Sequence, residues 1–194
     1  MPPQSESGQF TYVNAGQQVA VERFTRTAET IESDLRIVSG LRVTFSARVT
    51  GGTVTQVLLR AFSPTDSVTP AQTATVRIGT DTLTLETVRS GAPIVDKLPV
   101  PAGVVPYLDP SAVWMEEIVK RAKVLGGTSV RVPIAILSAP QQIATAAVTF
   151  TSPTQVRLES TNVSVLLTLD EAGRILRGEV PSQGVVFTRS TAAR

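Results

Sequence analysis

The 194-residue sequence contains no cysteine and no histidine. Without these side chains the protein lacks disulfides, thiol nucleophiles, Ser-His and Cys-His catalytic pairs, zinc fingers and most transition-metal sites. Lysine is scarce, with 3 residues against 15 arginines, and aromatic residues make up only 5% of the chain. No run of 18 apolar residues occurs, so we expect no membrane span.

Valine and threonine are abundant instead, with 27 and 25 residues, whereas charged residues make up 18%. Because β-branched residues favour strands, this composition predicts a mainly β protein and argues against a coiled coil, an all-helical protein or a disordered chain. The length fits one domain with a sizeable core. We expect a disordered or linker N-terminus over 1–8 and a single β-rich domain over 9–190.

The arginines are spread along the chain, and the net charge is only +2 although the pI is near 9.4. Without histidine there is little buffering near neutrality, so a small excess of basic groups is enough to raise the pI. No three arginines are consecutive, and none are interleaved with aromatic residues as in many nucleic-acid binders. We therefore expect scattered surface arginines and no nucleic-acid partner.

Apolar and polar residues alternate along most of the sequence. Segment 41–50 is the clearest case, and Gly51-Gly52 then supplies the positive φ of a hairpin turn. Segment 53–62 is apolar on both faces, which indicates a central strand. Further strands are expected at 9–14, 18–26, 29–38, 72–79, 82–89, 129–137, 142–151, 154–160, 162–169, 174–180 and 184–189. Short connections predict an antiparallel meander, and about 11–14 strands must curve into a half-barrel or open barrel.

One segment departs from this pattern. Five prolines in 91–110 predict an extended chain outside the centre of the sheet. Asp109-Pro110 has the pattern of an N-cap followed by proline at the first helical position, and Gly126-Gly127 has the pattern of a C-cap. The sequence therefore predicts one amphipathic helix near 110–125.

The two faces of this helix differ in composition. Its apolar stripe contains Trp114, Ile118, Ala122 and Leu125, which we expect to be buried against the sheet. Two i,i+4 pairs, Glu116 with Lys120 and Glu117 with Arg121, are expected on the solvated face.

No motif for catalysis or nucleotide binding is present. The sequence lacks a Gly-x-Ser-x-Gly elbow, a phosphate-cradling glycine loop and a calcium-loop pattern, so no cofactor or metal is expected. Four carboxylates lie within predicted strands and remain a catalytic option, because a glycosidase pair forms in space and not in sequence. They are Glu22, Asp34, Glu86 and Glu159.

Both ends of the sequence resemble a known kind of protein. Gly8–Tyr12 and Gly16–Phe24 resemble the first hairpin of small exported bacterial β proteins of unknown function, and Leu169–Pro181 resembles their terminal hairpin. The element order is more distantly similar to the periplasmic lipoprotein carriers and related lipid-binding half-barrels. This resemblance implies an apolar cavity for acyl chains, no catalysis, and a periplasmic or secreted protein whose signal peptide has been replaced by Met1. The carriers place helices near the start, so ligand residues are not transferred from them.

These observations favour a non-enzymatic binding or carrier protein for an apolar or amphipathic ligand, such as a small molecule or lipid. A curved sheet with few aromatic side chains encloses space, so we expect a cavity between the sheet and the helix. The residues expected to border it are Tyr107, Trp114, Ile118, Phe45 and Phe62. Two alternatives stay open: a structural or assembly module that self-associates through its sheet edges, and a carboxylate-dependent hydrolase using the same cavity.

Overall fold

The computed structural model describes residues 5–88, 93–138, 142–161 and 163–191. Within these residues the protein is mainly β, with fifteen strands, one α-helix and one 3₁₀ helix. The strands are β1 (Glu6–Asn14), β2 (Gln17–Arg26), β3 (Thr30–Ile37), β4 (Arg42–Thr50), β5 (Thr53–Ser63), β6 (Asp66–Ile78), β7 (Thr82–Val88), β8 (Ile94–Pro99), β9 (Val105–Tyr107), β10 (Ser129–Ile136), β11 (Gln142–Ser152), β12 (Gln155–Ser160), β13 (Val163–Leu169), β14 (Ile175–Val180) and β15 (Val185–Thr191). The helices are α1 (Ala112–Leu125) and η1 (Pro181–Gln183).

Hydrogen bonds connect the strands in the order β8-β7-β6-β5-β4-β3-β2-β1-β15-β14-β13-β12-β11-β10-β9. The pairings from β2 to β8 and from β10 to β15 are antiparallel, whereas β9 pairs with β10 in parallel. The order ends at β8 and β9, so hydrogen bonds do not close the sheet of the described strands, and the expected mainly β fold class is confirmed.

The strand number exceeds the expected 11–14 because the proline-rich segment adds two short strands, β8 and β9. Both lie at an end of the strand order. This position agrees with the chemistry of proline, which has no N–H to donate and is therefore disfavoured in the middle of a sheet.

The chain divides into two compact units. The first contains residues 1–9, 19–103 and 191–194, and the second contains residues 10–18 and 104–190. The single domain over 9–190 stays a prediction. Of the expected linker over 1–8, residues 1–4 lie outside the described residues, whereas β1 already begins at Glu6. The expected linker therefore extends too far, because β1 includes polar residues before its first apolar residue, Phe10.

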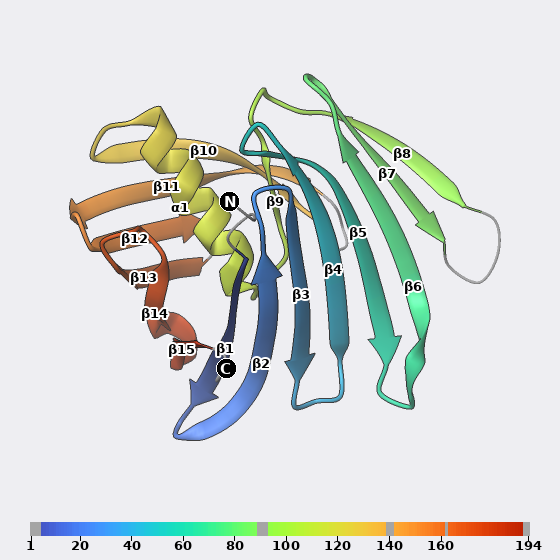
Figure 1. Ribbon diagram of the computed structural model, residues 1–194, viewed down its shortest axis with the longest axis horizontal. Helices are drawn as coiled ribbons and strands as arrows, with labels where there is room; N and C mark the ends of the chain where they lie inside the picture. The colour runs from blue at the N-terminus through green and yellow to red at the C-terminus, as the bar shows by residue number, and fades with distance from the viewer. Residues whose placement is uncertain (1–4, 89–92, 139–141, 162, 192–194) are drawn as a thin grey trace. The chain divides into compact units, whose positions relative to one another are not determined.

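In the first unit, β2 to β8 form a twisted antiparallel meander (Figure 1). Residues alternate between a buried and a more exposed face, as the period of two requires. The buried face is apolar and includes Ala20, Phe24, Ile31, Leu35, Phe45, Ala47, Val57, Leu59, Ala74, Val76, Leu83 and Leu85. The opposite face of β2–β5 carries mostly arginine, acidic and hydroxyl side chains.

In the second unit, α1 packs on β9, β10 and β11 (Figure 1). Trp114, Ile118 and Ala122 are fully buried, as the apolar stripe predicted. Leu125 is 47% exposed, and Val124 beside it is also exposed, because the last turn extends past the buried part of the helix. None of the helices in the described residues has the length and apolar sequence needed to cross a membrane.

The N-cap of the helix lies two residues later than the sequence indicated. Ser111, not Asp109, is the N-cap, and its side chain accepts a hydrogen bond from the Trp114 N–H at 3.4 Å. A distant side chain completes the cap: the Tyr12 hydroxyl accepts from the Ala112 N–H at 2.8 Å and donates to the Pro110 carbonyl at 3.0 Å. A residue about 100 positions away thus satisfies an N–H group that has no partner within the helix.

Glu116 is buried and not on the solvated face of the helix, contrary to expectation. Its Oε2 lies 2.8 Å from Nη1 of Arg189 on β15 and accepts from the Ile175 N–H at 2.9 Å. Lys120 lies 3.8 Å from the other carboxylate oxygen, so the expected i,i+4 pair is present. The guanidinium of Arg189 also lies over the Phe10 ring, 5.5 Å from its centroid. The helix is therefore tied to β14 and β15 through one buried carboxylate.

We expect Glu116→Gln to reduce the free energy of unfolding by about 3–5 kcal/mol, because it leaves the Arg189 charge buried without its carboxylate. Urea denaturation of the wild type and the variant measures the difference. Glu179→Gln is the control, since Glu179 and Arg177 form an exposed pair that should contribute less than about 1 kcal/mol. Equal losses in the two variants would show that the buried pair does not hold the helix.

Candidate functional site

The five residues expected to border a ligand cavity are all buried, but they belong to different parts of the chain. Phe45 on β4 and Phe62 on β5 lie in the first unit. Tyr107 on β9 and the α1 residues Trp114 and Ile118 lie in the second. The structure brings Phe45 and Phe62 together as lining residues of one pocket. A ligand-binding role for the five residues stays a prediction.

Strand register separates Phe45 from Phe62. Phe62 is paired with Arg42, and Phe45 is paired with Leu59. Because successive residues of a strand point to opposite faces, Phe45 projects to the apolar face and Phe62 to the polar face of these strands. Phe62 therefore lies on the same face as the pocket arginines, whereas the Phe45 side chain projects to the opposite, apolar face.

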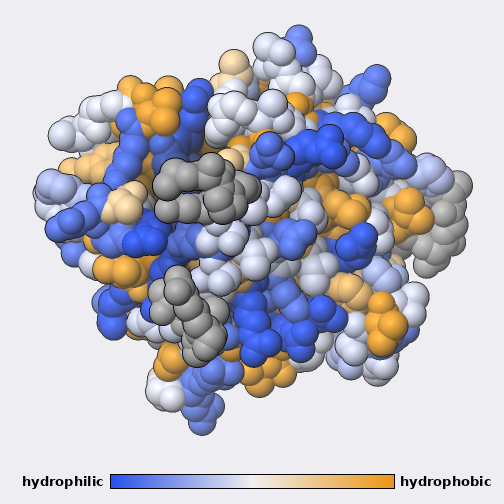
Figure 2. All heavy atoms as spheres, in the orientation of Figure 1, coloured by the Kyte–Doolittle hydropathy of each residue, from blue (hydrophilic) through white to orange (hydrophobic). Residues whose placement is uncertain are grey.

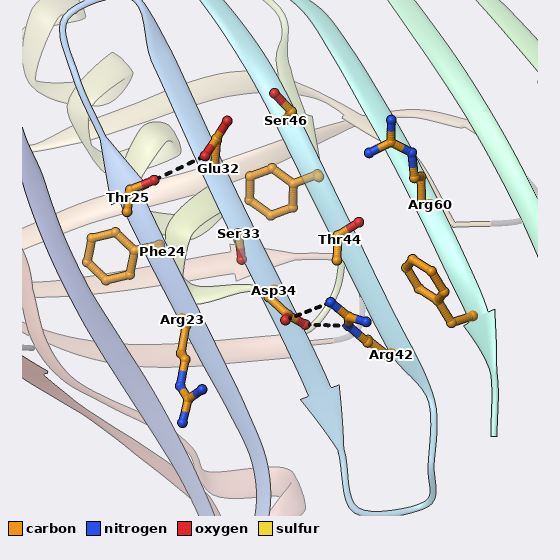
Figure 3. A pocket seen from close by; sticks show the side chains of 12 residues that line it. Arg23, Phe24, Thr25, Glu32, Ser33, Asp34, Arg42, Thr44, Ser46 and Arg60 are labelled. Atoms are coloured by element: carbon orange, nitrogen blue, oxygen red, sulfur yellow. Dashed lines mark hydrogen bonds and ion pairs between the residues drawn. The ribbon is translucent and has the colours of Figure 1, made fainter. Parts of the chain in front are cut away.

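This pocket has a volume of about 460 Å³ and lies along β2–β5, and we call it the arginine pocket (Figure 3). Most of its residues belong to the polar face of the first unit. They are Arg23, Phe24, Thr25, Glu32, Ser33, Asp34, Arg42, Thr44, Phe45, Ser46, Arg60 and Phe62.

Cross-strand pairing arranges these side chains in rows. One row contains, from β2 to β5, Arg23, Asp34, Thr44 and Arg60. The next row contains Thr25, Glu32 and Ser46. Neighbouring strands lie about 4.8 Å apart, so members of a row are direct neighbours. Thr44 and Ser46 on β4 are short, whereas β2 and β5 carry arginines, and this difference in side-chain length hollows the sheet surface along β4.

Asp34 and Arg42 form the best-defined interaction in the pocket (Figure 3). Arg42 Nε donates to Asp34 Oδ1 at 2.9 Å, and Arg42 Nη2 donates to Asp34 Oδ2 at 3.0 Å. Arg36 Nη2 donates to the same Oδ2 at 2.9 Å. Arg42 is fixed further by the Ser67 carbonyl, 3.0 Å from its Nη1, and by the Phe62 ring, whose centroid lies 4.7 Å from its Cζ. A bidentate pair of this kind has little freedom to reorient.

The pKa of Asp34 is lowered from its ordinary value of 3.8. Burial acts in the opposite direction and raises this pKa, but the hydrogen bonds and charges of Arg36 and Arg42 together outweigh it. Asp34 is therefore ionised at neutral pH and is poorly suited to donate a proton, which weakens its candidacy as a general acid.

The four strand carboxylates considered for catalysis have separate environments. Glu22 is buried and accepts a hydrogen bond from the Ser33 hydroxyl at 2.8 Å. Glu86 pairs with Arg77, and Glu159 lies on β12 in the second unit. Of the four, only Asp34 lines the arginine pocket. In the part of the chain that the structure describes, no group of three or more acidic residues could hold a metal ion.

The pocket carries three guanidinium groups, Arg23, Arg42 and Arg60, against the two carboxylates Glu32 and Asp34. Its lining therefore has a net positive charge. Figure 2 shows hydrophilic residues over much of the visible surface, with hydrophobic residues in small separate patches. The arrangement suits a ligand with an anionic group better than a purely apolar one.

Sequence reasoning treated these arginines as scattered and missed them as a site. A partial signal was present, because Arg42 occupies a polar position of the alternation over 41–50, whereas Arg60 lies in a segment that is apolar on both faces. Pairing the hairpins in register would have placed them on one face. The exact register depends on turn geometry and bulges, which alternation by itself does not give.

Comparison with known proteins gives one structural likeness to report. No protein-family model matches the sequence, and no curated protein matches it. The fold is similar to the crystal structure of a beta-barrel-like protein of the domain of unknown function DUF1849 from Brucella abortus, with a TM-score of 0.57 and 9% identity over 98% of each chain. At this identity the likeness shows the fold alone. The likeness agrees with the expected resemblance to small β proteins of unknown function. It gives no support for similarity to the lipoprotein carriers or for export.

The lowered pKa of Asp34 predicts a pH-dependent contribution to stability. This contribution is complete above the ordinary pKa of 3.8 and is lost as the pH falls through the lower folded-state value. The free energy of unfolding of Asp34→Asn should therefore lie below that of the wild type at neutral pH, and the gap should narrow below pH 3.8.

Urea denaturation at a series of pH values from about 7 to about 2 measures this gap. Asp96→Asn is the control, because it removes the same charge from an exposed position on β8 outside the pocket. A gap for Asp34→Asn that does not change with pH would contradict the predicted stabilisation of the carboxylate by Arg36 and Arg42.

Proposed function

We propose that this protein is a non-enzymatic binding or carrier protein, and that its arginine pocket holds an amphipathic ligand. The observation that carries the proposal is the composition of the pocket, where three guanidinium groups surround short hydroxyl side chains beside the Phe62 ring. Guanidinium groups bind carboxylate and phosphate oxygens, and an aromatic ring provides an apolar contact. The volume of about 460 Å³ lies in the range of small-molecule sites.

The second-unit residues expected at a cavity support the proposal less directly. Tyr107, Trp114 and Ile118 are at most 5% exposed and, unlike Phe62, do not line the arginine pocket. A ligand would contact these side chains only after a rearrangement. We therefore place the ligand in the arginine pocket, and we retain a periplasmic or secreted location as part of the proposal, which fractionation of the source cells tests.

A fluorescent fatty-acid analogue should bind saturably, with a dissociation constant of about micromolar, and unlabelled fatty acid should displace it. Thr44→Trp should abolish this binding, because the larger indole occupies the pocket volume along β4. Arg48→Gln on the same strand lies outside the pocket lining and serves as the control. Circular dichroism and urea denaturation verify that both variants fold. Absence of saturable binding to the wild type would refute the carrier function.

An assembly module is the second candidate, and the exposed edge strand β8 favours it. Ile94 and Val95 are 64% and 55% exposed, and β8 ends the strand order. The Val100 N–H donates to the Asp81 carbonyl on the β7 side at 2.9 Å. Alternation then turns the backbone groups of Val95 and Lys97 toward the open edge, where another strand can pair.

Charge on β8 opposes pairing with a second copy of itself. A two-fold axis makes the two β8 strands antiparallel, and backbone alternation allows only residues whose numbers add to an even value to face each other. The two such registers with the greatest overlap place Asp96 opposite Asp96 or Lys97 opposite Lys97. Like charges directly opposite each other are destabilising, and edge charges protect sheets from association.

We therefore expect a monomer at both dilute and high concentration in size-exclusion chromatography with light scattering. Lys97→Val removes the edge charge and should introduce concentration-dependent association. Arg48→Val, which places the same side chain on an interior strand of the first unit, should leave the mass unchanged. A dimer of the unaltered protein would instead favour the assembly module.

A further inference from the structure

The arginines of the pocket differ in the partners they already have. Arg42 donates two hydrogen bonds to Asp34 and one to the Ser67 carbonyl, so its charge is balanced and its plane is fixed. Arg23 donates from Nε to the side-chain oxygen of Gln9 at 3.1 Å. Arg60 lines the pocket, and its side chain makes no hydrogen bond or ion pair with any other residue that the structure describes. Its guanidinium is thus the one in the pocket lining that keeps all of its donors available.

The neighbours of Arg60 are hydroxyl side chains. Thr44 on β4 and Thr73 on β6 are paired directly with it in its cross-strand row. The close-up shows Arg60 on β5 and the short side chains of Thr44 and Ser46 on the neighbouring strand β4 (Figure 3). A guanidinium next to hydroxyl donors can surround an oxyanion with several hydrogen bonds, and hydrogen bonds between charged groups are the strong ones.

We infer that Arg60, together with the Thr44 hydroxyl, binds the oxyanionic head group of the ligand, a carboxylate or a phosphate. Arg42 is a positioning residue, which Asp34 holds against the Phe62 ring so that the ring and the guanidinium form a fixed wall. The inference rests on the proposed function, because it names the chemical class of ligand that the pocket selects. The apolar part of the ligand then extends from Arg60 along β4 toward Phe62.

Three probes with the same alkyl chain test this assignment by titration calorimetry below their micelle concentrations: dodecanoate, dodecyl phosphate and dodecanol. Dodecanoate and dodecyl phosphate should bind more tightly than the uncharged dodecanol. Arg60→Gln should weaken binding of the anionic probe or probes by about 10- to 100-fold and leave dodecanol binding within about twofold. Comparison of the two anions shows which head group the pocket prefers.

Two matched variants separate charge from geometry. Arg48→Gln removes the same charge from the same unit outside the pocket, so its affinity for dodecanoate should stay within about twofold of the wild type. Arg60→Lys keeps the charge but loses the planar fork of donors, so it should recover only part of the affinity.

The outcomes for the inference and for the proposed function differ. If the wild type binds dodecanoate saturably and Arg60→Gln binds it equally well, the head-group assignment is wrong and the carrier function stands. If dodecanol binds as tightly as the anions, the pocket does not select an oxyanion, and the inference also fails. If none of the three probes binds saturably, both the inference and the carrier function fail.

Discussion

Cross-strand register is the constraint on which the first unit depends. The period of two along each strand puts apolar residues on one face and polar residues on the other, and pairing of neighbouring hairpins extends each face across the sheet. Arg23, Asp34, Thr44 and Arg60 come from four strands but form one row because each is paired with the next. A slip of one residue in any of these hairpins would turn one member of the row into the apolar face. The core and the arginine pocket therefore have the same physical origin.

Within the pocket, chemically identical side chains acquire different roles through their partners. Asp34 holds Arg42 in a bidentate pair, and the Phe62 ring packs against the Arg42 guanidinium. The charge of Arg42 is therefore balanced, and its side chain forms a fixed part of the pocket wall. Arg60 faces hydroxyl groups and retains its donors for a ligand. In the second unit, Glu116 has the opposite environment, since its carboxylate is fully enclosed and joins α1 to β14 and β15. Buried charge thus fixes the helix, whereas the proposed binding depends on the exposed charge of Arg60.

Much of the fold could be predicted from the sequence. All thirteen expected strands and the helix are present, because alternation, glycine turns and the stop at Gly126 are local signals that tertiary contacts reinforce. The strands that were missed, β8 and β9, are short and proline-containing, so they have little alternation to detect. The helix start was placed at Asp109 and not at Ser111, because the Tyr12 hydroxyl that completes the cap lies about 100 residues away in the sequence.

The sequence by itself determined the mainly β class, the order of the hairpins, the position of the helix and the absence of thiol and imidazole chemistry. These properties depend on composition and on patterns within about ten residues. Only the tertiary structure decided that Glu116 is buried, that Phe45 and Phe62 point to opposite faces, and that three of the arginines line one pocket. The physical reason is that burial and charge pairing depend on register between strands, and register joins residues whose separation in sequence carries no periodic signal.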